Sequence, residues 1–110
     1  MVTVNRPWGK YVIVEKKPGY WIKKLYLNQG ESLSLQRHEG RKEVWTVIKG
    51  EIEATVDSKT ETVKPGGTVI IEKTQKHRMK AIHKALVIEV AFGEVLEGDN
   101  DRLEDKYGRK

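Results

Sequence analysis

The chain has 110 residues, of which 34% are charged, and it contains no cysteine. This length predicts a single domain spanning residues 1–110 with one hydrophobic core. The lack of cysteine excludes disulfides, thiolate zinc sites and cysteine nucleophiles, so any bound metal must take nitrogen and oxygen ligands.

The charge pattern narrows the possible partners. The net charge is +5, but 16 acidic residues are interspersed among 21 basic ones and there is only one Phe. We therefore expect no nucleic-acid binding, because that function favours a basic block and exposed aromatic platforms. A modest positive excess suits a small anion such as a sugar phosphate. No apolar run approaches the ~18 residues of a membrane span and no signal sequence opens the chain, so we expect a cytoplasmic protein without a membrane partner.

Short apolar runs alternate with turn residues along most of the chain, which is typical of strands. No sustained helical periodicity occurs between residues 8 and 92, so the pattern predicts an all-β sandwich or barrel of about nine to eleven strands. The polar tail 97–110 is expected to carry one helical turn or to wrap the barrel mouth. The predicted strands are 10–16, 20–27, 32–38, 43–49, 51–56, 61–64, 68–73, 78–82 and 85–92.

Period-two alternation separates two faces of these strands. In 32–38, the Ser32, Ser34, Gln36 and His38 side chains share one face, and Leu33, Leu35 and Arg37 share the other. In 43–49, Val44 and Ile48 lie opposite Glu43. Apolar side chains on an outer face need a cover. We expect a homodimer to supply it, with the chain's own N-terminal strands as the alternative.

Four potential metal ligands stand in the two segments Gly30–Gly50 and Gly66–His77, and they are Gln36, His38, Glu43 and His77. Gln36 and His38 share a strand face, Glu43 follows after a turn, and a barrel can bring His77 beside them. A lone histidine in a strand is more often structural. The four together predict one divalent ion, with Zn, Mn, Co, Ni or Fe all chemically admissible.

The spacing of these residues resembles a known family. The pattern G-x5-Q-x-H-x4-E-x6-G, from Gly30 to Gly50, resembles the first cupin motif with Gln in place of its first His. The motifs RPWGKY (6–11), LSLQRHEGRKEVW (33–45), KHR (76–78) and RLEDKYGR (102–109) resemble the cupin domain of type II mannose-6-phosphate isomerases. In that family the domain is usually the C-terminal part of a bifunctional protein that also carries a mannose-1-phosphate guanylyltransferase.

The resemblance implies a single-domain cupin fold, that is, a double-stranded β-helix or jelly-roll barrel, here as a stand-alone domain. It also implies the interconversion of mannose 6-phosphate and fructose 6-phosphate in carbohydrate metabolism and polysaccharide biosynthesis. The family's ligand positions fall on the four residues named above. For catalysis the candidates are Glu39, Arg41 and Tyr107, and for binding the phosphate they are Arg41, Arg102 and Arg109, because forked guanidinium donors suit phosphate.

The chain also departs from the family pattern. Three histidines of the usual Q-M-H-H-H-R-A-E-H-W are replaced by Glu39, Gly40 and Val44. Two other functions therefore remain open: a metal-dependent cupin of different chemistry, such as an Fe(II) oxygenase, and a non-catalytic sugar-phosphate-binding cupin. Trp8 and Trp45 are interpreted as core residues, and His83 as a solvent-exposed residue outside the site.

Overall fold

The computed structural model describes residues 1–93 and the backbone of residues 101–104. Within these ranges the chain forms strands and turns and contains no helix, so none that could span a membrane. The all-β prediction is confirmed. The strands are β1 (Val2–Arg6), β2 (Gly9–Lys17), β3 (Tyr20–Leu27), β4 (Leu35–Arg37), β5 (Arg41–Val56), β6 (Lys59–Val63), β7 (Thr68–Ile71), β8 (His77–Gly93) and β9 (Asp101–Glu104).

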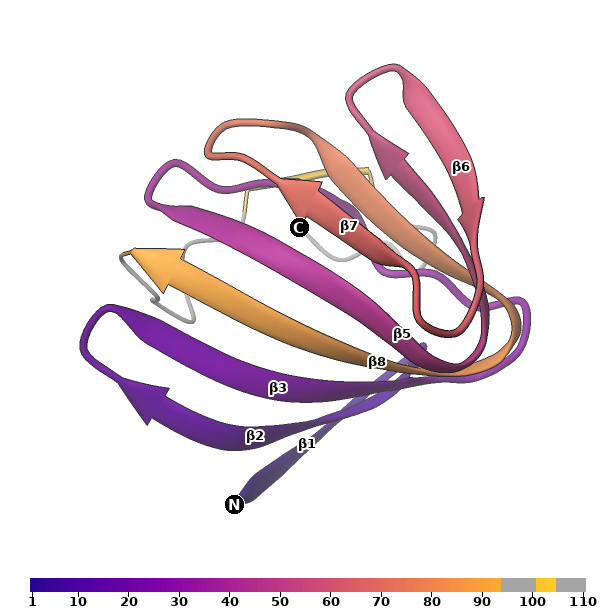
Figure 1. Cartoon of the computed structure of the whole chain (residues 1–110), viewed down its shortest axis with the longest axis horizontal. Helices are drawn as coiled ribbons and strands as arrows, with labels where there is room; N and C mark the ends of the chain where they lie inside the picture. The colour runs from indigo at the N-terminus through magenta and orange to yellow at the C-terminus, as the bar shows by residue number, and fades with distance from the viewer. Residues whose placement is uncertain (94–100, 105–110) are drawn as a thin grey trace.

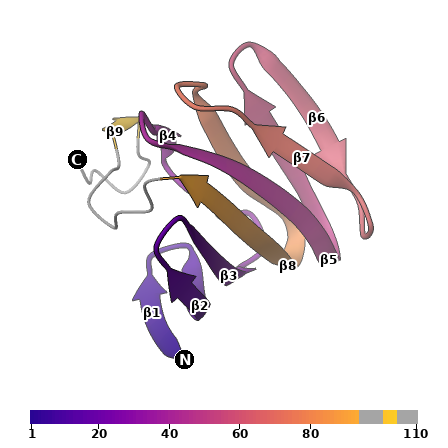
Figure 2. The ribbon, with the colours of Figure 1, turned by 60° about the vertical axis from the view of Figure 1, so that its left-hand side comes forward.

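Two long strands, β5 and β8, hold the architecture together because each runs through both halves of one continuous nine-stranded sheet, which folds over into two facing layers, called here the two sheets (Figure 1). The first half of β5 pairs with the second half of β8, and this pair is flanked by β7 on one side and by β3, β2 and β1 on the other. The remaining halves pair with each other beside β6, β4 and β9. Figure 2 shows β4 and β9 side by side at the end of the molecule away from the β6 hairpin.

Alternating burial explains why these segments become strands. In β3 every second side chain is buried, from Trp21 through Leu25 to Leu27, while the residues between them are half-buried. This is the pattern of a sheet with one face turned to a core. The main core fills the space between the two sheets and includes Trp8 and Trp45, as predicted.

Some strands that were predicted as separate are joined in the structure, and β-bulges explain the difference. The predicted strands 43–49 and 51–56 form one strand, β5, whose pairing with β8 shifts register between Val47 and Ile52. The predicted strands 78–82 and 85–92 likewise join in β8. Turn-like residues at these places mark bulges inside long strands, where the chain bends from one sheet into the other.

The segment 32–38 is less regular than predicted, since only Leu35–Arg37 forms a strand. Leu33 was predicted to lie on an outer face that needs a cover, but it packs against the core of its own chain. It is half-buried there, because its backbone bonds to Met79 outside a regular ladder. The strand β1 had no counterpart among the predicted strands, and its side chains are mostly exposed.

Gly50 lies where β5 packs closely against the backbone of β8, and we expect Gly50→Ala to destabilise the fold by about 3 kcal/mol. Its φ is +79°, in the region that favours glycine. A Cβ there would collide with the Lys84 carbonyl oxygen and lie 2.8 Å from the Ala85 Cα. Denaturant unfolding followed by circular dichroism measures the loss.

The matched control for this change is Gly66→Ala. Gly66 has a similar φ of +90°, but no atom lies within 4 Å of a Cβ built there. This variant therefore carries only the backbone strain, about 1–2 kcal/mol. Equal losses in the two variants would show that the contact between β5 and β8 at Gly50 is not tight.

Candidate metal centre

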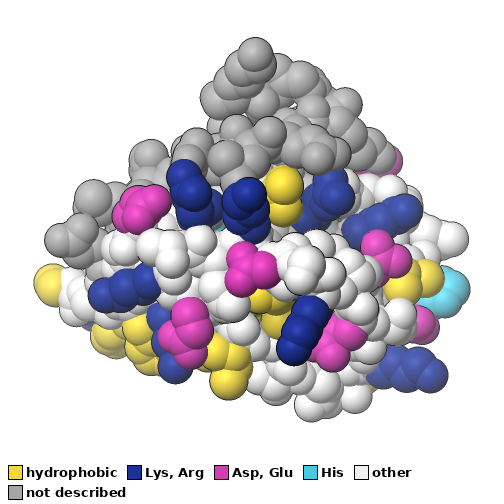
Figure 3. Space-filling view, turned by 90° about the horizontal axis from the view of Figure 1, so that it is seen from above, with side chains coloured by type: hydrophobic (Ala, Val, Ile, Leu, Met, Phe, Trp, Pro, Cys, Tyr) yellow, Lys and Arg dark blue, Asp and Glu magenta, His cyan; other side chains and the backbone are white. Residues whose placement is uncertain are grey.

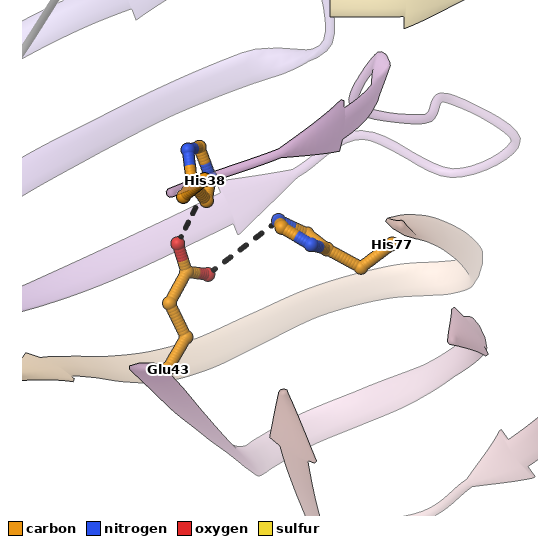
Figure 4. Close-up of side chains that lie close together, drawn as sticks. All are labelled: His38, Glu43 and His77. Carbon is orange, nitrogen blue, oxygen red and sulfur yellow. Dashed lines mark ion pairs between the residues drawn. The ribbon is translucent and has the colours of Figure 1, made fainter. Parts of the chain in front are cut away.

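Three of the predicted ligands converge in the interior at one end of the barrel. His38 follows β4, Glu43 lies on β5 and His77 begins β8, and Figure 4 shows their side chains turned toward one another. One ligand atom from each lies within 4.8 Å of the others, and all three residues are buried. The two sheets thus bring together residues that are up to 39 positions apart (77 − 38) in the chain.

Glu43 is the centre of this group, because each of its carboxylate oxygens faces a different histidine. Oε2 lies 3.1 Å from His38 Nε2, and Oε1 lies 4.0 Å from His77 Nε2. Burial alone would raise the pKa of Glu43. The positive charge of Arg41, whose Nε also donates to this carboxylate, opposes burial and holds this pKa well below its usual range. Glu43 is therefore an anionic ligand at neutral pH.

His77 is oriented by a contact behind it. Its Nδ1 lies 3.0 Å from the Gln75 carbonyl oxygen, to which it donates a hydrogen bond. This bond leaves the Nε2 lone pair directed toward Glu43, as metal-binding histidines require. Burial lowers the pKa of His77, so the ring is neutral and available as a ligand. The Trp45 ring packs edge-on against it, 5.7 Å away.

Arg41 contacts two of the predicted ligands, Glu43 and His38. Its Nε donates to Glu43 Oε2 and its Nη2 donates to His38 Nε2, both at 2.9 Å. Trp45 Nε1 donates to the other Glu43 oxygen, also at 2.9 Å. His38 Nε2 must carry a lone pair to accept from Arg41, so a cation lies between two electron-rich atoms. A metal bound at His38 Nε2 would replace this hydrogen bond from Arg41.

The group fits a divalent cation. Metal–ligand distances of about 2.0–2.2 Å place neighbouring ligand atoms roughly 3–3.5 Å apart, and the His38–Glu43 distance of 3.1 Å lies in this range. The separation between His77 and Glu43 is somewhat longer and would close slightly on an ion. Two neutral imidazoles and one carboxylate suit borderline transition metals, although they do not select one.

Gln36, the fourth predicted ligand, is placed beside the group by the sheet register. It is the direct antiparallel partner of His77, so both side chains project from the same face. Gln36 is half-buried, and its Nε2 donates to Ser34 Oγ at 2.8 Å. This bond fixes the amide nitrogen and leaves the Oε1 atom as the ligating atom to be expected.

The remaining residues singled out from the sequence are either exposed or have side chains outside the described part of the structure. Glu39 is 67% exposed and lies 3.5 Å from Arg37 in the turn before β5. Arg102 belongs to β9, of which only the backbone is described, and Tyr107 and Arg109 lie outside the described residues. His83 is exposed as predicted, 3.9 Å from Glu51 and outside each motif.

A buried pair of ionisable residues next to the centre was not predicted. Lys23 and Glu89 are direct cross-strand partners on β3 and β8, and each is only 6% exposed. Trp21 Nε1 donates to Glu89 Oε2 at 2.9 Å, and Lys23 Nζ lies 3.5 Å from the centroid of the Trp21 ring. Burial, with the nearby charge of Glu43, raises the pKa of Glu89 to about 8, against the opposing effect of Lys23.

A signal for this pair was present in the sequence. Alternation in ALVIEVAF places Glu89 on the same face as Val87 and Ala91, and alternation in YWIKKLYL places Lys23 with Trp21. A single charged residue within an apolar face is informative, because such residues are rarely buried without a function or a partner.

Comparison with known proteins identifies the family of this chain. Residues 1–105 match the family model described as "Mannose-6-phosphate isomerase C-terminal". The alginate biosynthesis protein AlgA of Pseudomonas aeruginosa is 38% identical over 109 residues, which cover 96% of this chain and 23% of that protein. The chain thus spans about a quarter of the length of the curated relatives it matches.

Solved structures support the fold. The structure of KdgF from Halomonas superposes with a TM-score of 0.81 at 18% identity, covering 86% of this chain and 90% of KdgF. The cupin domain of Cnp3 from Schizosaccharomyces pombe gives a TM-score of 0.73 at 18% identity, covering 77% and 64% of the two chains. The predicted cupin fold is therefore confirmed, and the chain belongs to the family of mannose-6-phosphate isomerase C-terminal domains.

Proposed function

We propose that this chain is a metal-dependent aldose–ketose isomerase that interconverts mannose 6-phosphate and fructose 6-phosphate. The observation that carries the proposal is the buried group of His38, Glu43 and His77, in a chain that belongs to a mannose-6-phosphate isomerase family. Because the chain matches only part of its longer relatives, the reaction is an inference from this group and not a property transferred with the family.

In this proposal Gln36, His38, Glu43 and His77 hold one divalent ion. An ion held there supplies a Lewis acid for two neighbouring sugar oxygens. Glu43 is the single anion of the ligand set and the other three ligands are neutral. The ligands thus offset only about one of two positive charges, and the centre retains attraction for the negative charge that develops when C2 loses its proton.

Arg41 is suited to the reacting end of the sugar. It is buried, and its guanidinium contacts both His38 and Glu43, so its charge lies beside the atoms that would bind the sugar oxygens. The phosphate at C6 lies at the other end of the substrate. We assign its recognition to Arg102 and Arg109, whose forked donors match phosphate oxygens.

The proton moved between C2 and C1 needs a base within reach of both carbons. Glu39 and Tyr107 are the proposed candidates. Glu39 directly follows His38, and its exposed carboxylate is free to reorient, since a surface contact with Arg37 at 3.5 Å holds it weakly. The roles of Glu39 and Tyr107 as the base rest on the family resemblance. The same resemblance favours a small sugar phosphate as the only substrate.

A coupled assay with mannose 6-phosphate, run on protein of measured metal content, tests the proposal. We expect fructose 6-phosphate to form, chelation to abolish its formation, and added Zn, Mn, Co, Ni or Fe to restore it. The His83→Ala variant should retain the wild-type rate, because His83 is 63% exposed and lies outside the group. Product formation is decisive, since direct proton transfer from C2 to C1 would hide exchange with solvent.

A folded, metal-replete protein that forms no fructose 6-phosphate would defeat the isomerase proposal. If the same protein binds mannose 6-phosphate without turnover, the non-catalytic cupin is the correct function. The replacement of family histidines by Glu39, Gly40 and Val44 is the observation that favours this second candidate.

A further inference from the structure

The loop between β7 and β8, residues 72–76, contacts both histidines of the candidate metal centre. Gln75 uses its carbonyl oxygen to accept the hydrogen bond from His77 Nδ1, at 3.0 Å. The backbone N–H of Thr74 donates to the carbonyl oxygen of His38, at 2.8 Å. The orientation of one imidazole and the backbone position of the other therefore depend on the shape of this loop.

The turn between β5 and β6 holds this loop from outside. In Figures 1 and 2 the tip of that turn lies beside the β7–β8 loop. The Asp57 carboxylate in the turn accepts from the backbone N–H of Lys76 and from Gln75 Nε2, both at 3.0 Å. The Asp57 backbone N–H donates to the Lys76 carbonyl oxygen at 2.7 Å. We call these three hydrogen bonds the Asp57 clamp.

The Gln75 side chain connects the clamp to the start of the loop. Its Oε1 accepts from the backbone N–H of Glu72 at 2.9 Å, while its Nε2 donates to Asp57. A backbone N–H can only donate and a carboxylate can only accept, so these partners fix which end of the amide is the oxygen. The bond between Gln75 and Asp57 can therefore be broken, and restored, by exchanging donor for acceptor.

The backbone is strained on both sides of the clamp. The φ angle is +53° at Asp57 and +72° at Thr74, and in the described part of the chain only these non-glycine residues have a positive φ. Aspartate tolerates this conformation, but for a β-branched threonine it is an outlier. Such strain persists only where surrounding contacts hold it, and it clusters at functional sites. The clamp supplies such contacts to the loop.

Water competes for the bonds of the clamp. Asp57 is exposed and Gln75 is half-buried. Figure 3, which views the molecule from above, shows basic and acidic side chains mixed over this side. One exposed hydrogen bond contributes little, because water can replace it. Several bonds to one residue support one another, since each holds the geometry that the others need.

We propose that Asp57 is a positioning residue of the metal centre. Through the clamp it fixes the β7–β8 loop, and the loop in turn holds His38 and His77 in the geometry that binds a divalent ion. Asp57 acts through the loop and not by contact with the ion, as outer contacts of metal ligands do. The inference rests on the metal centre of the proposed function.

Two single variants and their combination test the clamp. Asp57→Asn keeps the size of the side chain and its tolerance of a positive φ. Its amide oxygen can accept from Lys76 or from Gln75 but not from both, so one bond is lost. Gln75→Glu instead sets two carboxylates against each other. In the double variant the new amide donates to the new carboxylate, and the bond is restored.

Titration of Co²⁺ into metal-free protein, followed by visible absorption, measures the affinity of each variant. We expect each single variant to bind Co²⁺ about tenfold more weakly than the wild type, and the double variant to recover to within about twofold. General destabilisation would instead accumulate in the double variant. Glu61→Gln is the matched control, because it removes an exposed carboxylate from the same hairpin, and it should bind as the wild type does.

A second measurement needs no metal. Correlation of ring nitrogens and protons by NMR at about pH 8, where imidazoles are neutral, shows which nitrogen carries the proton. The chain has three histidines, so the signals can be assigned by variants. The His77 proton should reside on Nδ1 in the wild type and in the double variant, and should be shared between the two nitrogens in each single variant.

The two measurements separate this inference from the proposed function. Unchanged His77 tautomers in both single variants, or a double variant no better than the single ones, would overturn the role of Asp57. A wild-type protein that binds no divalent metal would defeat the proposed function, and the tautomers alone would then decide whether Asp57 orients His77.

Discussion

Replacing His38 by alanine is expected to lower the affinity for a divalent metal by about 100-fold or more, because losing even a residue that only orients a ligand typically costs 10–100-fold. His38 Nε2 lies 3.1 Å from Glu43 and the residue is buried. A side chain from the protein surface therefore cannot take its place as a ligand. Arg41 would then keep its bond to Glu43 and neutralise the remaining anion.

The matched control for this prediction is His83→Ala. His83 also lies near a carboxylate, Glu51 at 3.9 Å, but it is 63% exposed on β8. Elemental analysis after dialysis, together with titration of Co²⁺ or Zn²⁺ into metal-free protein, gives occupancy and affinity for each variant. Equal occupancy in His38→Ala and His83→Ala would refute the assigned centre, and circular dichroism establishes that both variants are folded.

The fold could be predicted because alternation is a local property of the chain. The run YWIKKLYL alternates so regularly that the predicted strand 20–27 coincides with β3. The continuity of β5 and β8 could not be predicted in this way. Glycine at position 50 is typical of a turn, and only the pairing with β8 on both sides of it, with a bulge at this point, shows that β5 continues through it.

The candidate metal centre could likewise be predicted only in part from the sequence. Spacing and alternation brought His38 and Glu43 together, the expected barrel placed His77 beside them, and the resemblance agreed with this choice. Arg41 was predicted to act in catalysis and to bind phosphate. Its contact with two of the ligands was not predicted, because it depends on a side-chain path across β5 that spacing does not encode.

The buried pair of Lys23 and Glu89 shows where local patterns fail. Each residue is unremarkable alone, and their meeting depends on the pairing of β3 with β8, which are 66 positions apart at this point (89 − 23). Burial beside the candidate metal centre raises the pKa of Glu89, and this shift leads to the second large effect that we expect.

The stability of the metal-free protein should fall as the pH rises from about 4.5 to 8, relative to the Glu89→Gln variant. Burial raises the pKa of Glu89 to about 8 in the folded state, compared with 4.5 for an ordinary glutamate. Between these values the unfolded chain has released the proton that the folded chain retains. Stability therefore declines by about 1.4 kcal/mol per pH unit, or roughly 4–5 kcal/mol over the window.

Glutamine has nearly the same shape as glutamate and keeps an oxygen that accepts from Trp21, so the variant removes the titration and retains the hydrogen bond. His77, whose pKa burial lowers, adds an opposite slope near its ordinary value of 6.5 in both proteins. The difference between the two stability curves cancels that slope. It should favour glutamine increasingly toward pH 8 and level off above it.

Urea unfolding in EDTA at a fixed protein concentration, repeated across the window, measures this difference. Glu61→Gln is the control, because it replaces a carboxyl exposed to water on β6 and should give a curve parallel to that of the wild type. Parallel curves of stability against pH for wild type and Glu89→Gln would mean that Lys23 and Trp21 stabilise the Glu89 carboxylate enough to offset its burial. The site would then contain a permanent ion pair beside Glu43 instead of a carboxyl that holds its proton near neutral pH.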